Sequence, residues 1–549
     1  MLRTLLVIII SGCIHRLYGQ SEMETRIQEI TSQIGTVTGN MQFDAQTYQY
    51  DSIIGTPKVP EKARSNMFTN ILWYKGHFSA GFRYEHYLNP LLGFDPRYTG
   101  SGIPYRFAKF TSDFLEVTIG NVYEQFGSGL ILRTFDDRSL GYDNSVDGFG
   151  VQIRPVSGVT VKGIWGRQRS FFTLGQGIVR GVDGEVSLNE LLDTSGTWKT
   201  QISVGGGFVS KYQPDQDPVY RLPENVGTWA ARLNFKVGKV NLFAEYAHKV
   251  NDPSAVNSFI YKNGEALLLT LSYARKNLGF SLNAKRLDNM DFRSDRTASG
   301  NNLNINFMPP IAKQHTYRLN TLYLYATQPL GEMGLQGDLY LNLPKETSLG
   351  GKYGTNITMN FSIVQNIDTT QLSNGLGYES KFFSIGKRMF YRDFNIEINR
   401  KISSKLKLTA AYFNIVYDKD KIQGLSGVGT VYANMWVLEA LFKINAKHSI
   451  RMEAQQLLTK QDMGNWMMGL LEYTISPHWF LAVFDEYNYG NKEKMQRIHY
   501  LSSQIGYQRG NSRLTVGYAR QRAGLVCVGG LCRVVPASNG FQVSVTTSF

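Results

Sequence analysis

The sequence predicts an all-β fold, one large antiparallel transmembrane β-barrel of roughly 24 strands, between about 22 and 26. Three observations predict it. Apolar and polar residues alternate in many short segments, tight turns alternate with long polar loops, and the chain ends in an alternating strand that stops at Phe549. Beyond the first few residues, no apolar run approaches the roughly 18 residues that a spanning helix needs.

The amino-terminus indicates export. Met1-Leu2-Arg3 and the apolar run at 5–10 have the features of a secretory signal peptide. Two cleavage sites compete. We favour cleavage after Gly19 over a lipoprotein-like cleavage before Cys13, because a barrel is held by its wall and needs no lipid anchor. A segment that ends at 34 is too short to be the plug domain of a TonB-dependent transporter. The expected parts are therefore a signal peptide at 1–19, a short periplasmic segment at 20–34 and the barrel at 35–549.

Composition fits a barrel better than a nucleic-acid-binding protein. The 549 residues include 54 Gly, 31 Tyr and 31 Phe but only 3 Cys, and the formal net charge is +14. The basic residues are scattered between apolar strands and form no recognition motif, so no nucleic-acid partner is expected. Either the charge attracts anionic solutes and lipopolysaccharide phosphates, or it reflects a generally basic solvated surface.

Alternation with period two defines the expected strands. In 240–248, Val240, Leu242 and Ala244 share one face, while Asn241 and Glu245 share the other. The same pattern recurs at 267–273, 278–285, 335–341 and 406–412. Apolar residues outside and polar residues inside are the arrangement of a barrel wall.

The connections between these strands fall into two classes. Tight turns are expected at 156–158, 237–239, 275–277, 330–332, 445–447 and 510–512, which are rich in turn-forming residues. Longer polar segments such as 212–226 and 290–316 lie between them. This sorting predicts one rim of short turns and one of long loops, with the long loops outside the cell. A soluble β-sandwich has no reason to sort its loops in this way.

One region resists assignment by period. A direct count gives about 25 strands, which an even-stranded barrel does not allow. The irregular segment is 343–389, which contains Leu349-Gly350-Gly351 and the pair Phe382-Phe383. We expect the miscounted strand to lie there.

The lumen is expected to be filled in part by inward loops, because an empty barrel of this size would leak small solutes. The best candidate is 121–147, which is long, Gly-rich and aromatic and carries both charge signs. Arg133 and Arg138 either bind an anion or form internal salt bridges with Asp136, Asp137 and Asp143 that hold the loop. The predicted constriction or ligand-binding residues are Tyr123, Glu124, Arg133, Arg138, Asp143 and Asn144.

The last loop carries a predicted disulfide. With Phe549 at the periplasmic rim, residues 522–539 are expected to point outward at the cell surface. After signal removal, Cys527 and Cys532 are the remaining cysteines, and they flank a Gly-Gly turn in an oxidising compartment. A metal site is not expected, since none of the 8 His lies in this loop.

The final strand has an apolar face. Taken alone, it fits an edge strand of a soluble sandwich as well as the closing strand of an outer-membrane barrel. With the rest of the chain, the barrel is favoured, and Phe541 and Phe549 are the predicted signal for the barrel-assembly machinery. The residues on this face are Phe541, Val543, Val545, Thr547 and Phe549.

Three motifs carry a resemblance to a known family. They are Gly120 to Gly129, Leu349 to Asn356, and the segment from Arg522-Ala523-Gly524 to Pro536-Ala537-Ser538. These motifs resemble a family of uncharacterised outer-membrane β-barrel proteins from Bacteroidota, over nearly the whole mature chain. The resemblance implies the fold and a location in the outer membrane of a Gram-negative bacterium, with the C-terminus in the periplasm. It implies no substrate and no functional residue.

Transport is the expected class of function. The sequence has no H-E-x-x-H, G-x-S-x-G or P-loop motif, so we expect neither an enzyme nor a cofactor. A wide wall with a Gly-rich inner loop predicts a channel or transporter for an unidentified solute. The alternatives are a non-transporting component of a secretion or envelope-assembly complex, with protein partners, or a surface adhesion protein.

Overall fold

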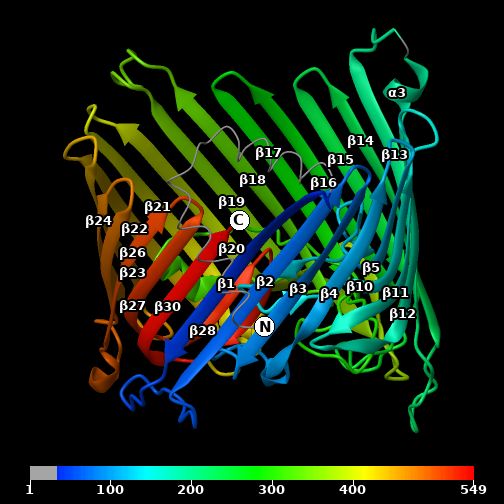
Figure 1. Cartoon of the computed structure of the whole chain (residues 1–549), viewed down its shortest axis with the longest axis horizontal. Coiled ribbons are helices and arrows are strands. Elements are labelled where there is room, and N and C mark those ends of the chain that lie inside the picture. The colour runs from blue at the N-terminus through cyan, green and yellow to red at the C-terminus, as the bar shows by residue number, and fades with distance from the viewer. Residues whose placement is uncertain (1–33, 194) are drawn as a thin grey trace.

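The wall is a closed antiparallel barrel of 24 strands in the computed structural model, which describes residues 34–193 and 195–549. Each wall strand pairs with the wall strands before and after it in the chain, and β30 (Ser538–Ser548) closes the ring by pairing with β1 (Thr36–Thr47) (Figure 1). The predicted fold class is confirmed, and the strand number is the centre of the predicted range. The predicted signal peptide, the alternative cleavage at Cys13 and residues 20–33 lie outside the described residues.

The other wall strands have the following bounds: β2 (Ala63–Lys75), β3 (Phe78–Leu88), β4 (Gly100–Thr111), β5 (Leu115–Val122), β10 (Val146–Ile153), β11 (Val159–Ser170), β12 (Thr173–Ser187), β13 (Thr200–Tyr212), β14 (Asn225–Val237), β15 (Val240–Lys249), β16 (Gly264–Arg275), β17 (Leu278–Asp288), β18 (Gly331–Leu343), β19 (Thr355–Gln371), β20 (Tyr378–Lys401), β21 (Leu406–Asp418), β22 (Thr430–Lys443), β23 (His448–Thr459), β24 (Trp466–Ile475), β25 (Trp479–Tyr487), β26 (His499–Arg509) and β27 (Ser512–Gln521).

Short elements occupy the connections. They are η1 (Pro96–Tyr98), β6 (Gln125–Phe126), β7 (Leu132–Arg133), β8 (Asp136–Asp137), β9 (Tyr142–Asp143), α3 (Leu188–Leu192), η2 (Arg318–Tyr323), α4 (Lys419–Gln423), η3 (Lys494–Gln496), β28 (Gly524–Val528) and β29 (Leu531–Val535). Among the described residues, no helix has the length and apolar character needed to cross a membrane.

The predicted alternation is present in the wall. In the register of β15 with β16, Leu242 lies opposite Leu271 and Ala244 opposite Leu269. Leu271 is exposed on the outer side, whereas Glu245 and Ala247 are buried toward the lumen. Because side chains alternate along each strand, such pairs give the barrel an apolar outer belt and a more polar inner face.

The two rims differ as expected, with exceptions. In Figure 1 the turn between β14 and β15 lies at the upper, short-turn rim, where β1 begins and β30 ends; the long connections lie at the lower rim. Two connections on the short-turn rim are long, 188–199 with α3 and 344–354, while only 171–172 joins β11 to β12 on the other rim. The predicted tight turn at 330–332 was wrong, because Gly331 begins β18 at the end of a long loop.

The irregular region at 343–389 forms most of the hairpin of β19 and β20. The pairing of these strands shifts in register near Gln365, Ile367 and Thr369. A bulge changes which side chains face outward, so the period breaks although the strand continues. This explains why the region resists assignment by period.

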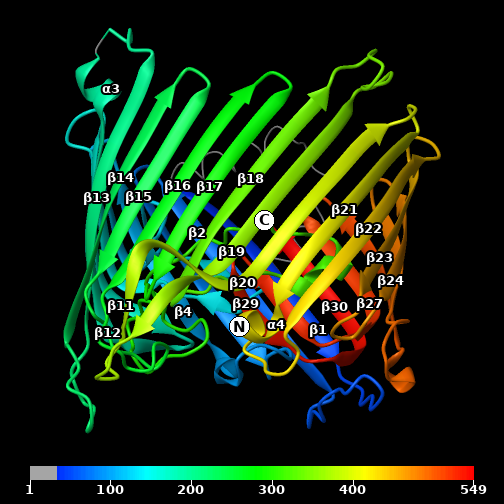
Figure 2. The same cartoon turned by 180° about the vertical axis from the view of Figure 1, so that it is seen from behind.

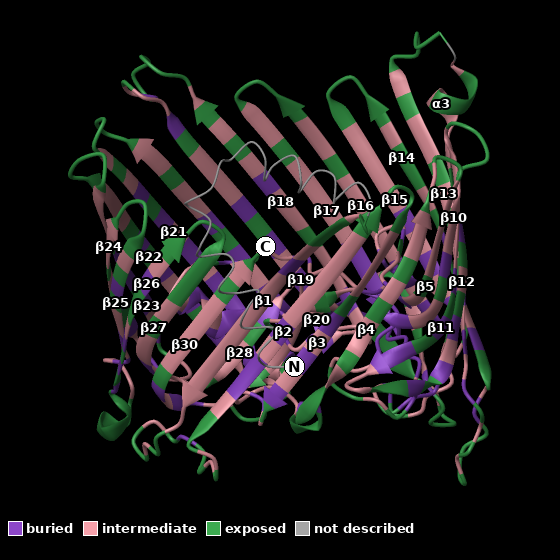
Figure 3. Cartoon of the chain, in the orientation of Figure 1, coloured by how far each residue is buried: buried purple, intermediate pink, exposed green. Residues whose placement is uncertain are grey.

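Buried residues gather in the half of the barrel near the long-loop rim, as the purple segments in Figure 3 show. The loop at 121–147, which was predicted to fold into the lumen, contributes buried residues to this region. The segment at 290–316 was predicted to be an outward loop, and this was wrong: the whole connection 289–330 folds against the inner wall. Its Phe292, Ile305 and Leu319 are at most 1% exposed, and burying such apolar side chains favours the inward path.

Candidate functional site in the lumen

Three connections meet inside the long-loop end of the barrel, and we call them together the plug. They are 123–145, 289–330 and 522–537, which carries the β28–β29 hairpin. In the first of these, Leu130, Ile131 and Leu132 are at most 1% exposed. They form one hydrophobic cluster with Phe292 and Ile305 of the second segment and with inward valines of β12 and β13. An apolar core therefore joins two distant loops to the wall.

A second cluster holds the rest of 289–330. Leu319 and Tyr323 of η2 pack in one cluster with Phe413 of β21, Met435 of β22 and Trp466 of β24. These wall residues are buried toward the lumen, where a plain water-filled channel would have polar side chains. The large apolar residues on the inner wall therefore mark the height at which the plug sits.

Hydrogen bonds connect the first two plug segments. The Arg133 amide donates to the Ile305 carbonyl over 2.9 Å, and the Phe307 amide donates to the Gly129 carbonyl over 2.9 Å. The Asn144 side chain donates from Nδ2 to the Asn304 carbonyl over 2.8 Å. Asn144, which was predicted to line a constriction or bind a ligand, is 1% exposed. Its side chain holds backbone groups of the plug in position. Backbone and side-chain hydrogen bonds therefore join the two segments.

A buried ion-pair cluster attaches 123–145 to the wall. Arg169 of β11 contacts Glu85 of β3 and Asp143 of the plug, each with an N–O distance of 2.6 Å. Arg83 of β3 pairs with Asp136 over 2.9 Å and also with Asp143. Burial raises the pKa of the Asp143 carboxyl, but Arg169 and Arg83 outweigh burial and hold the pKa below its usual value.

The sequence analysis missed Arg83, Glu85 and Arg169. They lie on inward faces near the long-loop ends of their strands, and their plug partners are far away in the sequence. A pair of charged residues two apart in an otherwise aromatic strand, as at 83 and 85, is the one signal that could have pointed to them.

Tyr123 and Glu124 face the wall on the other side of the same loop. The Tyr123 ring stacks on Tyr105 with centroids 5.0 Å apart, and its hydroxyl donates to Asp143 over 3.0 Å. Glu124 accepts from the Lys162 ammonium over 2.8 Å. These predicted residues are therefore close together, and each already has a partner from the wall or the loop.

Arg133 and Arg138 differ from each other: Arg138 forms the predicted internal ion pair with Asp136, whereas Arg133 does not. The Arg133 guanidinium lies between the rings of Phe135 and Phe307, at 4.8 and 4.2 Å from their centroids. With the described residues it makes no ion pair. Arg138 donates to Gln42 over 3.3 Å and lies 3.9 Å from Asp136. Burial lowers the pKa of both guanidinium groups.

The segment 289–330 is bonded to the wall along its length. His315 lies 2.6 Å from the Asp393 carboxylate, and the Tyr317 hydroxyl donates to Glu397 over 2.9 Å. Arg318 contacts Glu486 over 2.5 Å. Asp393 and Glu397 lie on β20 and Glu486 lies on β25, so the contacts reach across the inner face of the wall from β20 to β25.

The last hairpin, in the third plug segment, packs against the other two. Cys527 and Cys532 form the disulfide, and their carbonyls accept from Gln314 over 2.8 Å and Asn301 over 2.8 Å. The Arg533 guanidinium donates to the Ser139 carbonyl over 2.8 Å, and burial lowers its pKa to about 10. The expectation of an outward-pointing loop is corrected here, because this hairpin has polar and apolar partners in the other two plug segments.

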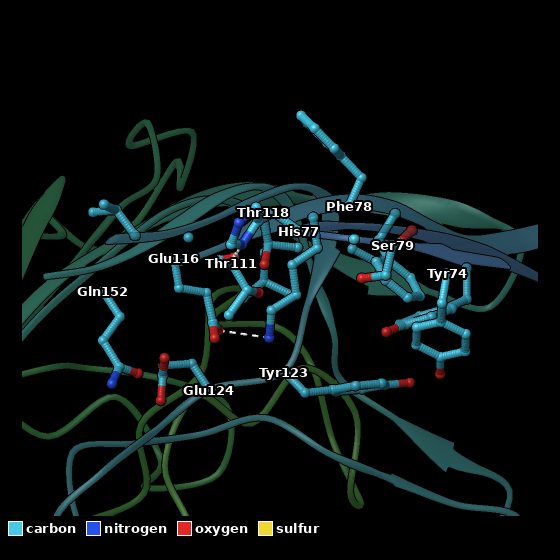
Figure 4. Close-up of a pocket in the computed structure, with 18 residues that line it drawn as sticks. Tyr74, His77, Phe78, Ser79, Thr111, Glu116, Thr118, Tyr123, Glu124 and Gln152 are labelled. Atoms are coloured by element: carbon cyan, nitrogen blue, oxygen red, sulfur yellow. Dashed lines mark hydrogen bonds and ion pairs between the residues drawn. The ribbon is translucent and has the colours of Figure 1, made fainter. Parts of the chain in front are cut away.

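A pocket of about 540 Å³ lies on the inner face of β2 to β5 and β10. Figure 4 shows Glu116, Glu124 and Gln152 on one side of it and Tyr74 on the other, while Phe78 points away. Lys109 and Glu116 pair across neighbouring strands over 2.6 Å. The lining runs from the short turn at His77 to Tyr123 at the plug, so the part of the lumen that the plug does not fill has a polar wall.

Comparison with known proteins gives a family and distant structural similarity. A family model described as a family of unknown function (DUF6029) matches residues 1–549. No curated protein matches the chain. The translocation pore of the P pilus usher PapC is 10% identical with a TM-score of 0.43, covering 93% of this chain and 99% of that chain. An Escherichia coli P pilus tip assembly intermediate, PapC-PapD-PapK-PapG, is 12% identical with a TM-score of 0.49, covering 94% and 61%. The siderophore receptor PirA from Pseudomonas aeruginosa is 10% identical with a TM-score of 0.41, covering 93% and 80%.

Proposed function

The chain belongs to the DUF6029 family of unknown function. For this member of the family, we propose an outer-membrane barrel that acts as a gated conduit for a solute. The membrane location rests on the wall itself. A closed barrel leaves no unpaired strand edge, and an apolar outer belt matches the hydrocarbon layer of a bilayer.

The presence of the plug in the lumen is the observation that supports a gate. Its three segments fill the long-loop end, and each is tied to the wall strands at both of its ends. Because both ends of each segment are joined to wall strands, a segment that shifts within the lumen stays attached and can return. The polar pocket between the plug and the short-turn rim is a binding site for the solute on that side of the plug. A passive porin would instead keep a water-filled passage.

We also infer the orientation. By analogy with bacterial barrels, the short-turn rim with the ends of β1 and β30 faces the periplasm, and the long loops face outward. Phe541 and Phe549 are 55% and 64% exposed, and Phe541 lies on the outer face of β30. This supports a role as the signal for the barrel-assembly machinery. Lipopolysaccharide is the expected neighbour of the long-loop rim.

Removal of the plug tests the proposal. Residues 296–326 would be replaced by a short Gly-Ser linker and the protein measured in planar bilayers. The full chain should stay mostly closed, whereas the deletion variant should give large, steady conductance. As a control, 492–496, an exposed loop tip, would be shortened in the same way and should leave the protein closed. Equal conductance of the full chain and the plug deletion would contradict the gate.

Arg133 and Arg138 offer a test of solute charge. Arg133 is a plug cation without a carboxylate partner among the described residues, and Arg138 has only a distant one. We infer that they face permeating ions when the plug shifts and favour anions. Replacing both with Ala should lower the anion preference of the openings in bilayers with a salt gradient. An unchanged reversal potential would remove these two residues from the pathway.

A sealed scaffold is the second candidate function. The hydrophobic clusters that cross from loop to wall also suit a barrel that never opens and instead binds protein partners through its long loops. Purification in mild detergent separates the two. A conduit should come alone and conduct after plug removal, whereas a component of an assembly or secretion complex should bring partners in fixed ratio.

A further inference from the structure

The hairpin of β19 and β20 extends beyond the wall and folds back along its outside. We call residues 366–388 the strap. Figure 2 shows this yellow-green segment lying across the lower ends of β15, β16 and β17. The strap is fixed there by side chains: the Tyr378 hydroxyl donates to Asp288 over 2.7 Å, and Arg286 lies over the Phe382 ring at 4.6 Å.

The strap has two faces because its side chains alternate. Tyr378, Ser380 and Phe382 are half-buried against the wall, where the Phe382 ring is 6.3 Å from the outward ring of Tyr246. The intervening residues point away from the barrel. Phe383 is 83% exposed and Ile385 is 52% exposed. A large aromatic and a β-branched residue are therefore displayed side by side on one outer face.

Lysines flank this apolar pair on the same face. Lys381 and Lys387 are exposed and form no ion pair with the described residues. Arg388 next to them is held by Asp418 over 2.5 Å, and Glu379, nearer the tip, is the acidic residue of this face. The order along the strand is thus basic, aromatic, aliphatic, basic.

This face continues the outer belt of the barrel. Tyr246 beneath the strap contacts Trp229 of β14, with ring centroids 5.6 Å apart. Aromatic residues on the outer face near a rim mark the level of lipid headgroups in membrane proteins, and Lys side chains at that level reach lipid phosphates. The strap brings both residue types to that level on a segment that closes no part of the wall.

We propose that the strap is a lipid-docking element that binds the phosphate-bearing lipids of the outer leaflet. Phe383 and Ile385 enter the boundary between headgroups and acyl chains, and Lys381 and Lys387 bind the phosphates on either side. This inference rests on the proposed membrane location but not on the gate. It assigns the strap a membrane surface as its partner, which the closed wall alone does not require.

A reporter at the strap tests the contact. Phe383→Cys and, as a matched control, Met495→Cys would each carry an environment-sensitive fluorophore, attached without reductant so that the disulfide stays intact. Met495 is 89% exposed on η3, away from the strap. In phosphatidylcholine bilayers with lipid A, the label at 383 should be blue-shifted and severalfold less quenched by iodide than the label at 495. Equal quenching at both sites would overturn the proposal.

Charge reversal tests the phosphates. Combined with the label at 383, Lys381→Glu with Lys387→Glu should raise the lipid A content needed for the blue shift by at least about fivefold per lysine. The same reversal at Lys276 and Lys447, in short turns of the opposite rim, should leave it unchanged. If the strap variant kept the wild-type dependence on lipid A, the phosphate contact would be refuted.

Two further results would show that the strap binds another partner or that the protein is not in the membrane. Shielding of the label in lipid-free detergent that grows with protein concentration would identify a second copy of the chain and overturn lipid docking. Liposome flotation separates the premise from the inference. A protein that floats but keeps label 383 in water refutes the strap alone, whereas one that does not insert refutes the membrane location.

Discussion

Arg169 joins the plug to the wall through two carboxylates at once. Its guanidinium contacts Glu85 and Asp143, and all three side chains are at most 5% exposed. Replacing Arg169 with Ala leaves two buried carboxylates short of a partner, and breaking a buried pair in this way costs about 3–5 kcal/mol. We expect the Arg169→Ala variant to open the plug in bilayers and to show a lower unfolding temperature.

Arg106 supplies the matched control. It pairs with Asp147 over 3.1 Å, but its side chain is 58% exposed. A surface pair of this kind contributes about 0–1 kcal/mol. Arg106→Ala should therefore stay closed and keep its stability, and similar behaviour of the two variants would show that burial at Arg169 has no special effect.

The pKa of Asp143 predicts how the plug responds to acid. A carboxyl with a depressed folded pKa stabilises the fold above its unfolded value of about 3.9 and loses that contribution as the pH falls through the folded value. As far as Asp143 determines it, the closed plug should show little change between pH 8 and 5 and begin to leak below about pH 4. Conductance against pH measures this.

Asp136 has the opposite sign and needs its own control. Burial raises its pKa more than Arg83 lowers it, so Asp136 favours the closed state in its protonated form, and that contribution is lost as the pH rises. The Asp136→Asn variant isolates Asp143. Opening of that variant between pH 8 and 5 would contradict the role given to Asp143.

The residues of the plug show what sequence reasoning reaches at this scale. Tyr123, Asp143 and Asn144 could be selected because they stand in one long Gly-rich loop, and the structure places them at the plug's contacts. Arg83 and Arg169 could not, because an inward polar residue in a strand has the same pattern whether it faces water or a buried carboxylate. The difference depends on a loop that is remote in sequence.

At the scale of elements, the β28–β29 hairpin holds the other two plug segments in place. The carbonyls of Cys527 and Cys532 are the acceptors for Gln314 and Asn301, so the disulfide fixes the acceptors as well as the hairpin. Closing so short a loop stabilises by about 2 kcal/mol in the loop-entropy model. We expect reductant to increase the frequency of openings in bilayers while the wall remains intact.

The double variant Cys527→Ser with Cys532→Ser separates this effect from other actions of a reductant. It should open as often as the reduced wild type and should not respond to reductant. A wild type that is equally closed before and after reduction, with loss of the disulfide verified by mass, would show that the hairpin's other contacts suffice.

The connection 289–330 shows why elements of this kind escape prediction. Its polar and Pro-containing sequence fits an outward loop, and its apolar residues are spaced without the period of a helix or a strand. Only the inner wall explains them, because Phe413, Met435 and Trp466 need an apolar partner inside the lumen. The strands could be predicted from alternation, whereas the path of this loop depends on a surface that several strands build together.

The whole molecule combines two kinds of cohesion. The wall is a continuous ladder in which every strand has two neighbours, and closing the ring by β1 and β30 removes its edges. The plug is held by two hydrophobic clusters and by ion pairs from separate strands. Alternation and sorted connections suffice to predict the wall, since they repeat along the chain, but the plug has no repeat and follows from the completed barrel.

This division predicts two stages of unfolding. Segments with few strand contacts open at a lower free energy than the ladder of a closed barrel. In increasing urea, protein in bilayers should first gain conductance while its far-UV circular dichroism stays unchanged, and the β-signal should fall only at higher urea. Arg169→Ala should shift the first stage to lower urea and leave the second in place, because it weakens the plug and not the ladder. If conductance and circular dichroism changed together in both proteins, plug and wall would form one cooperative unit, and a plug that moves inside a standing barrel would be ruled out.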